Sequence, residues 1–303
     1  MKIMAFDVGG TAIKFGLVDE NFNVLFSEDF PTNTYKDTDN MVLRAMEAKL
    51  KEYEGQFDAI GISTAGQINF ETTEINDGVG NIPNYNHTNL RNEFEPQFNV
   101  PVAVDNDVNC AAIGEAHFGA AQGEKDFLCL TYGTGVGGCI YINGDVYRGS
   151  KYAGGEFGHM ATHKDGRPCT CGRIGCYEAY AACRVFTASV SERMGRPMNG
   201  REIFEPENLA NPIIKEEINN WEDEIALGLR NLCYIFNPSF IVLGGGIMSE
   251  DMLIKDINEK VQAQLEDNYK HVKIVKAQLR NKAGMLGAAY LASERLKTWK
   301  KGE

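Results

Sequence analysis

The sequence predicts an α/β protein that contains two copies of one domain architecture. Short apolar strands separated by glycine turns occur near the amino terminus, and the same arrangement returns in the middle of the chain. The expected strands cover residues 2–8, 12–19 and 23–30, and then 126–132, 137–143 and 145–150. In both places the first strand runs into glycines and a threonine, GGT or GTGV, and another apolar strand follows at once. This repetition favours an internal duplication.

The remaining segments alternate between helix and strand, as in α/β folds. Helical spacing of apolar residues occurs over 41–53 and again at Trp221, Ile225, Leu229 and Leu232. The second of these helices should end at Asn237, because Pro238 follows it. Further strands are expected over 57–66, 100–107 and 239–247, and helices rich in small residues, which favour close packing, over 108–121 and 284–296.

Composition and charge exclude several classes of protein. With 303 residues, of which 43% are hydrophobic and 24% charged, the chain has the size and composition of a globular protein with two domains. Its net charge of −12 argues against a broad nucleic-acid-binding face and against attraction to anionic lipid. No apolar run approaches the roughly 20 residues of a membrane span, and the amino terminus lacks a signal-peptide pattern. We therefore expect a cytoplasmic protein without nucleic-acid or membrane partners.

The glycine turns are suited to bind phosphate, because backbone N–H groups there can approach oxygen atoms closely. The GTGVGG segment at 133–138 matches G-x-G-x-x-G, but the apolar CIYIN after it predicts a strand, not the helix of a dinucleotide-binding fold. GISTAG lacks the spacing of a nucleophile elbow, and no Walker sequence occurs. Two β-hairpin turns, one from each domain and facing each other across a cleft, fit better. Asp7, just before the first turn, could hold a magnesium ion directly or through water.

Three polar residues, Asp105, Asn106 and Asp107, stand between an expected strand and an expected helix. One of them could simply cap the helix. Ligands of open α/β sheets, however, bind at this end of the strands. A carboxylate here could accept a hydroxyl proton, as phosphoryl transfer to an alcohol requires, and the neighbouring amide could orient that hydroxyl.

The eight cysteines fall into two groups. Those expected to be buried as small hydrophobic residues occur singly in apolar or alanine-rich segments: Cys110, Cys129, Cys139, Cys183 and Cys233. The others form a cluster, and with one histidine they supply three thiolates and an imidazole, the ligand set of a structural zinc ion: His159, Cys169, Cys171 and Cys176. Gly172 and Gly175 would let the chain wrap around the ion with positive φ. A redox site and chance clustering are the alternatives; the C-x-C spacing disfavours the first.

These motifs resemble the ROK family, which is named for repressors, open reading frames and sugar kinases. DVGGT, GTGVGG, NDVN, GGEFGHM and CTCGRIGCYE occur in that order, and the resemblance runs from residue 3 to about residue 290. It implies two ribonuclease H-like domains of the actin and hexokinase superfamily around a central cleft. We place these domains at 1–118 and 119–303, with a zinc-binding insertion over 156–178 and a last helix, 288–300, that packs back onto the first domain.

The resemblance also implies site residues. Asp107 resembles the general base that takes a sugar hydroxyl proton, and Asn106 a ligand of a sugar hydroxyl. Further matches to the sugar pocket are Gly66, Asn81, Glu156, His159 and Glu178. Matches to the nucleotide site are Asp7, Gly9, Gly10 and Thr11 at the first phosphate loop, Thr134 and Gly135 at the second, and Gly244, Gly245 and Gly246 beneath the adenosine. The family has the same four zinc ligands, so the metal would direct His159 and Glu178 toward the sugar.

The chain departs from the family pattern at three positions. Asp105 stands where the family usually has glutamate, and Ala65 stands where it has proline. A lysine commonly follows GGT in the family, whereas this chain has Ala12, with Lys14 two residues on. We assign Lys14 no role from the sequence.

The resemblance implies an ATP-dependent kinase that phosphorylates the 6-hydroxyl of a hexose, with Mg²⁺ in catalysis and a structural Zn²⁺. Glucose is the first expectation, with N-acetylmannosamine and other aldohexoses as alternatives, and a homodimer is expected. A second hypothesis is a sugar-sensing transcription regulator of the same family. Such repressors carry an added amino-terminal helix-turn-helix, whereas the first sheet strand here begins at Lys2 or Ile3. A third hypothesis, an actin-like filament protein, leaves the cysteine cluster unexplained.

Overall fold

The computed structural model describes residues 1–36, 39–77 and 82–299. The chain divides into two compact units. Unit 1 comprises residues 1–118, 148–154 and 281–303, and unit 2 comprises 119–147 and 155–280. Each unit has its own hydrophobic core. Within the described residues, no helix is both long and apolar enough to span a bilayer.

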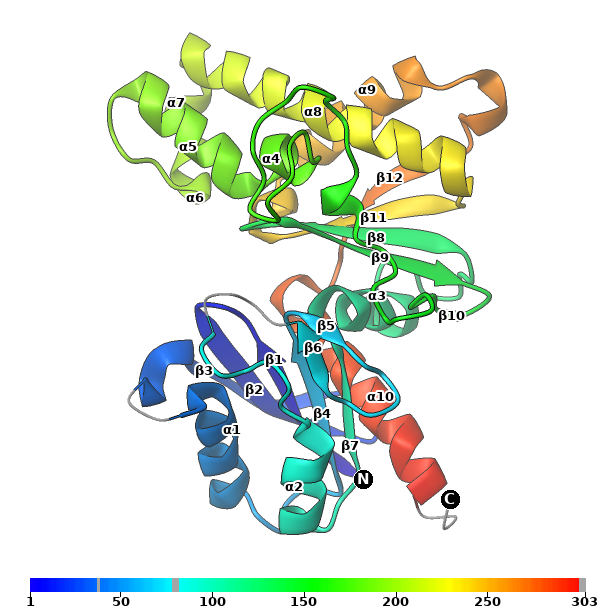
Figure 1. Ribbon diagram of the computed structural model, residues 1–303. Coiled ribbons are helices and arrows are strands. Elements are labelled where there is room, and N and C mark those ends of the chain that lie inside the picture. The colour runs from blue at the N-terminus through cyan, green and yellow to red at the C-terminus, as the bar shows by residue number, and fades with distance from the viewer. Residues whose placement is uncertain (37–38, 78–81, 300–303) are drawn as a thin grey trace. The chain divides into compact units, whose positions relative to one another are not determined.

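Unit 1 is built on a sheet with the strand order β3-β2-β1-β4-β7 (Figure 1). Its strands are β1 (Lys2–Val8), β2 (Ala12–Asp19), β3 (Val24–Pro31), β4 (Ala59–Thr64) and β7 (Val102–Asn106). The first three strands are antiparallel, and β4 and β7 continue the sheet in parallel with β1. Asp7, Ser63 and Asp105 therefore lie side by side where β1, β4 and β7 approach their carboxyl ends.

Helices cover both faces of this sheet. α1 (Met41–Glu52) and α2 (Leu90–Phe98) contribute Met46, Leu50 and Phe94 to a core shared with Phe6 of β1. α3 (Asp107–Phe118) and α10 (Ala283–Trp299) lie against each other, and α10 also packs on the sheet (Figure 1). The short elements of this unit are η1 (Thr32–Tyr35), β5 (Gln67–Ile68) and β6 (Ile75–Asp77).

The pairing of α3 with α10 depends on glycine. A Cβ atom at Gly287 would lie 1.8 Å from the carbonyl oxygen of Cys110, and one at Gly114 would lie 2.4 Å from that of Ala283. Backbone approaches of this kind exclude any larger residue. The expectation of close packing through small residues in the last helix is thus confirmed.

Unit 2 repeats the topology of unit 1, with the strand order β10-β9-β8-β11-β12. Its strands are β8 (Phe127–Tyr132), β9 (Val136–Ile142), β10 (Asp145–Val146), β11 (Phe240–Gly244) and β12 (Lys273–Lys276). Again the first three are antiparallel and the last two parallel to the first. The expected duplication is confirmed. The strand expected over 145–150, however, ends at Val146, and residues 148–154 pack in unit 1.

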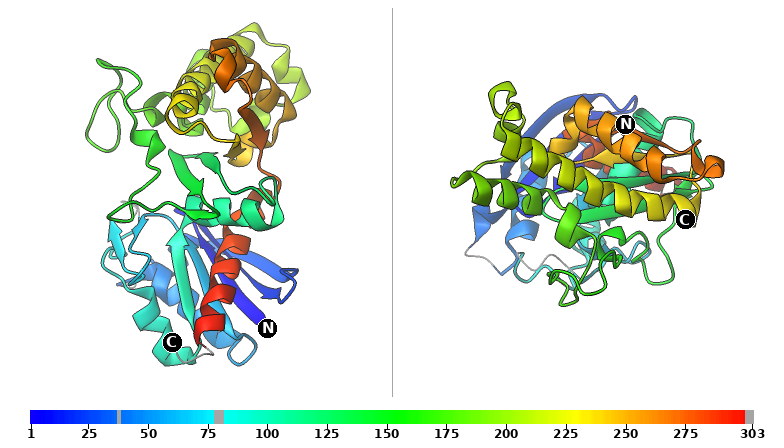
Figure 2. Two further views of the ribbon diagram at one scale, coloured as in Figure 1. Left: turned by 90° about the vertical axis from the view of Figure 1, so that its right-hand side faces the viewer. Right: turned by 90° about the horizontal axis from the view of Figure 1, so that it is seen from above.

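The helices of unit 2 include a long one, α8 (Pro212–Phe236), that lies beside α9 (Asp251–Gln264) (Figure 2). Trp221, Ile225, Leu229 and Leu232 of α8 are buried, and the helix ends at Asn237 in the left-handed conformation, as the sequence predicts. The other helices are α4 (Glu178–Ala181), α5 (Cys183–Met194), α6 (Gly200–Ile203), α7 (Pro206–Leu209), η2 (Phe157–His159), η3 (Gly246–Ser249) and η4 (Asp267–Tyr269). One further turn, η5 (Arg280–Lys282), spans the point where the chain passes from unit 2 to unit 1.

Candidate functional site

The first glycine turn joins β1 to β2 in unit 1. The amide of Gly9 donates to the carbonyl of Ala12 (3.0 Å), and the Thr32 hydroxyl donates to the carbonyl of Gly9 (2.8 Å). Thr32 also donates its amide to the carbonyl of Thr11 (3.0 Å). The turn is therefore held from one side, while Gly10 and Thr11 are exposed to solvent. A phosphate group could approach their backbone N–H groups.

Asp7, at the end of β1, is fixed by a buried serine. Ser63 is fully buried on the neighbouring strand β4 and donates its hydroxyl to Asp7 Oδ1 (2.8 Å). The other carboxylate oxygen, Oδ2, lies 4.0 Å from Nζ of Lys14, which is paired with Asp7 across β1 and β2. Burial raises the pKa of Asp7, while Ser63 and Lys14 oppose that shift. Sequence reasoning missed the contribution of Ser63.

The junction of β7 with α3 carries Asn106 and Asp107. Asn106 Oδ1 accepts the amides of Val108 (2.9 Å) and Asn109 (3.3 Å), so this side chain is the helix cap. Its Nδ2 donates to the carbonyl of Gly66 (3.0 Å), which ties two of the predicted sugar-site residues together. Two backbone amides and one carbonyl thus fix the orientation of the amide group.

Asp107 begins α3, and its carboxylate accepts the amide of Val108 (2.9 Å). Burial raises the pKa of Asp107 to about 7, and the negative charge of Asp7 adds to the shift. A carboxylate with a pKa near neutrality can take a proton in a transition state and still be ionised at working pH. The geometry and the pKa therefore suit Asp107 for general base catalysis.

The second glycine turn joins β8 to β9 in unit 2. The amide of Gly133 donates to the carbonyl of Gly135 (3.0 Å). Arg184 also binds the turn: its backbone amide donates to the carbonyl of Gly133, and its Nε donates to the carbonyl of Thr134. A Cβ atom at Gly135 would lie 2.6 Å from Glu178 Oε2, so a larger residue there would displace that carboxylate. No sequence pattern singled out Arg184.

The glycine run 244–246 follows β11 in the same unit. Gly245 has φ +111, and a Cβ atom there would lie 2.2 Å from the carbonyl oxygen of Tyr132, at the end of β8. Both the backbone conformation and the close approach require glycine. Gly245 and Gly246 are exposed, so their backbone is accessible to a ligand.

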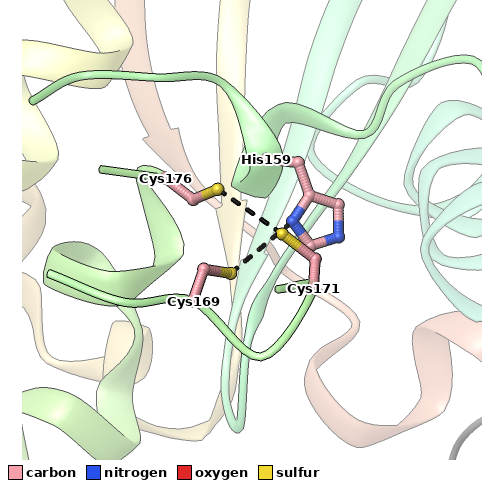
Figure 3. A group of neighbouring side chains, drawn as sticks. All are labelled: His159, Cys169, Cys171 and Cys176. Carbon is pink, nitrogen blue, oxygen red and sulfur yellow. Dashed lines mark hydrogen bonds between the residues drawn. The ribbon is translucent and has the colours of Figure 1, made fainter. Parts of the chain in front are cut away.

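The cysteine cluster is assembled as the sequence predicts (Figure 3). One ligand atom from each of His159, Cys169, Cys171 and Cys176 lies within 4.8 Å of all the others. Cys171 Sγ is 3.7 Å from Cys176 Sγ, and Cys169 Sγ is 3.9 Å from His159 Nδ1. A tetrahedral zinc ion with Zn–S bonds of about 2.3 Å holds its ligand atoms roughly 3.7 Å apart. The donor set therefore fits zinc in both chemistry and spacing.

The loop that carries the thiols turns on two glycines. Gly172 has φ +79 and Gly175 has φ +74, as expected for a chain that wraps tightly. A Cβ atom at Gly175 would lie 1.7 Å from the carbonyl oxygen of His163, so the two arms of the loop touch there. The conformation of the loop thus depends on its glycines as well as on any metal.

Of the predicted sugar ligands, His159 is a member of the cluster and Glu178 contacts it. His159 directs Nδ1 toward Cys169, and its other ring nitrogen, Nε2, lies 4.0 Å from Glu156 Oε2. Glu178 is buried at the start of α4, where Oε1 accepts from the Cys169 thiol (3.0 Å) and the Thr170 hydroxyl (3.1 Å). Asn81, the remaining predicted sugar ligand, lies outside the described residues.

Comparison with known proteins assigns the family. The ROK family model matches residues 3–295. A beta-glucoside kinase from Listeria innocua is 35% identical (96% of this chain, 97% of the relative), and a glucokinase from Streptomyces coelicolor is 32% identical (95% and 96%). A ROK glucokinase from Streptomyces griseus, solved with glucose and AMPPNP, superposes with a TM-score of 0.85 at 30% identity (97% and 100%). The chain therefore belongs to the ROK family, has its actin- and hexokinase-like two-domain fold, and is an ATP-dependent sugar kinase.

Proposed function

We propose that this kinase transfers the γ-phosphoryl group of ATP to the 6-hydroxyl of glucose, with Asp107 as general base. The observation that carries the proposal is the junction of β7 and α3. There a carboxyl with its pKa raised to about 7 stands beside Asn106, which is locked to Gly66. Such an arrangement can bind a hydroxyl and remove its proton.

In the proposed reaction, Asp107 accepts the proton of the 6-hydroxyl as that oxygen attacks the γ-phosphorus. The bond from the γ-phosphorus to the bridging oxygen breaks, and ADP leaves with the electron pair. Asn106 orients the hydroxyl, and the backbone amides of the two glycine turns bind the phosphates. Asp7 would hold Mg²⁺ directly or through water, and the ion would neutralise charge on the phosphates.

The cysteine cluster has a structural role in this proposal. His159, Cys169, Cys171 and Cys176 would hold Zn²⁺, which supplies a rigid anchor for the loop that carries them. Glu178 Oε1 accepts the hydroxyl of Thr170 within the same loop (3.1 Å), and Nε2 of His159 lies 4.0 Å from Glu156 Oε2. Glu156, His159 and Glu178 are then held as a set of polar groups for the sugar hydroxyls.

A second candidate substrate is a β-glucoside. It is favoured by the beta-glucoside kinases of two Listeria species, both 35% identical to this chain over nearly its whole length. N-acetylmannosamine and other aldohexoses remain the further alternatives. The distinction depends on how much room the pocket leaves around the anomeric oxygen and the 2-substituent, where one contact changes selectivity by about 1–3 kcal/mol.

The experiment is a coupled ADP-release assay over a substrate panel with Mg·ATP. The panel contains glucose, mannose, N-acetylglucosamine, N-acetylmannosamine and the β-glucosides cellobiose and salicin. We expect the highest kcat/KM with glucose and a product that comigrates with glucose 6-phosphate. A higher kcat/KM with a β-glucoside would select the second candidate, and phosphorylation at another hydroxyl would refute the 6-hydroxyl assignment. Light scattering of the same preparation tests the expected homodimer.

A further inference from the structure

Arg148 is a buried arginine in a short segment that packs in unit 1, although the chain before and after this segment belongs to unit 2. The chain enters unit 1 at Arg148 and leaves it after Gly154. The amide of Gly154 donates to the carbonyl of Arg148 (2.9 Å), so this segment is a closed loop whose ends meet. The side chain of Arg148 is only 10% exposed. Burying a guanidinium ion is costly unless the ion is paired and hydrogen-bonded. The groups that contact Arg148 should therefore show what its side chain does.

The partner of Arg148 is Asp105, whose side chain is 1% exposed. Arg148 Nε (3.0 Å) and Nη2 (2.7 Å) both donate to Asp105 Oδ2. The second carboxylate oxygen, Oδ1, accepts the backbone amide of Asn106 (2.8 Å) and Nδ2 of Asn109 (2.9 Å). Asp105 therefore accepts hydrogen bonds from both sides, and its carboxylate links Arg148 to the first turn of α3.

The guanidinium of Arg148 also contacts an aromatic ring. The Cζ atom of Arg148 lies 3.6 Å from the centroid of Phe70, in the range of a cation–π contact. Phe70 lies just beyond β5, four residues after Gly66. Gly66 in turn accepts the hydrogen bond from Asn106. Arg148 thus closes a ring of contacts that runs through Asp105, Asn106, Gly66 and Phe70.

We propose that Arg148 is a positioning residue for the sugar. It fixes the segment 105–107, which carries Asn106 and Asp107, against the segment 66–70, without contributing to the nucleotide side. The inference rests on the proposed function in one respect, the assignment of Asn106 and Asp107 to the sugar. Lysine could not replace arginine fully, because only the planar guanidinium can donate through two nitrogens and stack on Phe70 at once.

The test compares Arg148→Met with a matched control, Arg295→Met. Arg295 also pairs with a carboxylate of unit 1: its Nη2 lies 2.8 Å from Glu95 Oε1, which accepts the amide of Val102 at the other end of β7. We expect kcat/KM for the sugar to fall about a hundred-fold in Arg148→Met, since small misplacements of catalytic groups cost about that much. KM for ATP should change by no more than about two-fold, because the nucleotide contacts stay intact. Arg295→Met should leave both parameters near wild type.

Conservative variants and hydrogen exchange make the test independent of substrate identity and of folding. Arg148→Lys and Phe70→Leu should each give part of the loss. Amide exchange in the segments 65–72 and 105–110 should be faster in Arg148→Met than in Arg295→Met, whatever the substrate is. A protein that phosphorylates no sugar would refute the proposed function, while the exchange result would still decide the positioning role. Unchanged exchange in these segments, or equal rises in KM for sugar and ATP, would overturn the inference.

Discussion

Asp107 is the proposed general base, and burial is the main cause that raises its pKa to about 7. Only the ionised carboxylate can take the proton of the sugar hydroxyl. We therefore predict that kcat/KM for the sugar falls about ten-fold per pH unit below pH 7, a range in which a carboxyl of ordinary pKa stays ionised. The measurement is a pH–rate profile at saturating Mg·ATP. A rate that stays level down to pH 5 would contradict the assignment of the titrating group.

Asp107→Asn is the matched substitution, because it keeps the size of the side chain and removes the base. We expect sugar binding to persist and kcat to fall by about 10²–10⁴-fold. Turnover near that of the wild type would rule out Asp107 as the base. Binding is measured by calorimetry without ATP, so that loss of turnover is separated from loss of the site.

At the level of single residues, the sequence predicted groups that belong to compact motifs. The thiols, His159 and Asp107 all lie within short recognisable segments, and the structure brings the four cluster ligands together. Ser63 and Arg148 were missed because their partners, Asp7 and Asp105, lie 56 and 43 residues away in the chain. Periodicity and spacing report local structure, and they hold no information on such pairings.

At the level of elements, the zinc loop should decide how well Glu178 is placed. We predict that chelation of the metal, or Cys176→Ser, lowers Tm and raises KM for the sugar by at least about ten-fold. The physical reason is that Glu178 Oε1 accepts the hydroxyl of Thr170 (3.1 Å), which lies between Cys169 and Cys171, so the carboxylate moves when the loop loosens. Metal analysis, Tm and KM are measured on the same preparations.

Cys183→Ser provides the control for the zinc prediction. Cys183 is a half-buried single cysteine at the start of α5, seven residues beyond Cys176 and outside the cluster. This variant should retain about one zinc ion per chain and wild-type KM. A metal-free protein with unchanged Tm and KM would refute a structural role for zinc.

Most of the elements that the sequence predicted lie near their expected bounds, whereas α2, α5, α9 and β12 were not predicted. One predicted strand is wrong in an informative way. Residues 145–150 have the pattern of a third hairpin strand, yet the strand stops at Val146. Arg148 leaves the sheet to pair with Asp105 in unit 1. Beyond Tyr147, whose amide still donates to Ile140, an ion pair with Asp105 and a contact with Phe70 take the place of strand pairing, and local propensity cannot anticipate that exchange.

At the level of the whole molecule, the duplication was visible because both copies begin with the same local motif, an apolar strand and a glycine turn. The equal strand orders of the two sheets confirm it. The points at which the chain passes from one unit to the other were harder to predict. It changes unit at 118/119, 147/148, 154/155 and 280/281, and the loop 148–154 depends on long-range contacts.

The proposed sugar ligands are divided between the units: Asn106 and Asp107 belong to unit 1, and Glu156, His159 and Glu178 to unit 2. Under the proposed function, one hexose contacts both sets of side chains, so sugar binding should draw the two units together. We therefore predict that saturating glucose lowers the radius of gyration measured by small-angle X-ray scattering. Asp107→Asn should respond in the same way, because it retains sugar binding, whereas a sugar that is not phosphorylated should have no effect. An unchanged radius at saturating glucose would contradict the division of sugar contacts between the units.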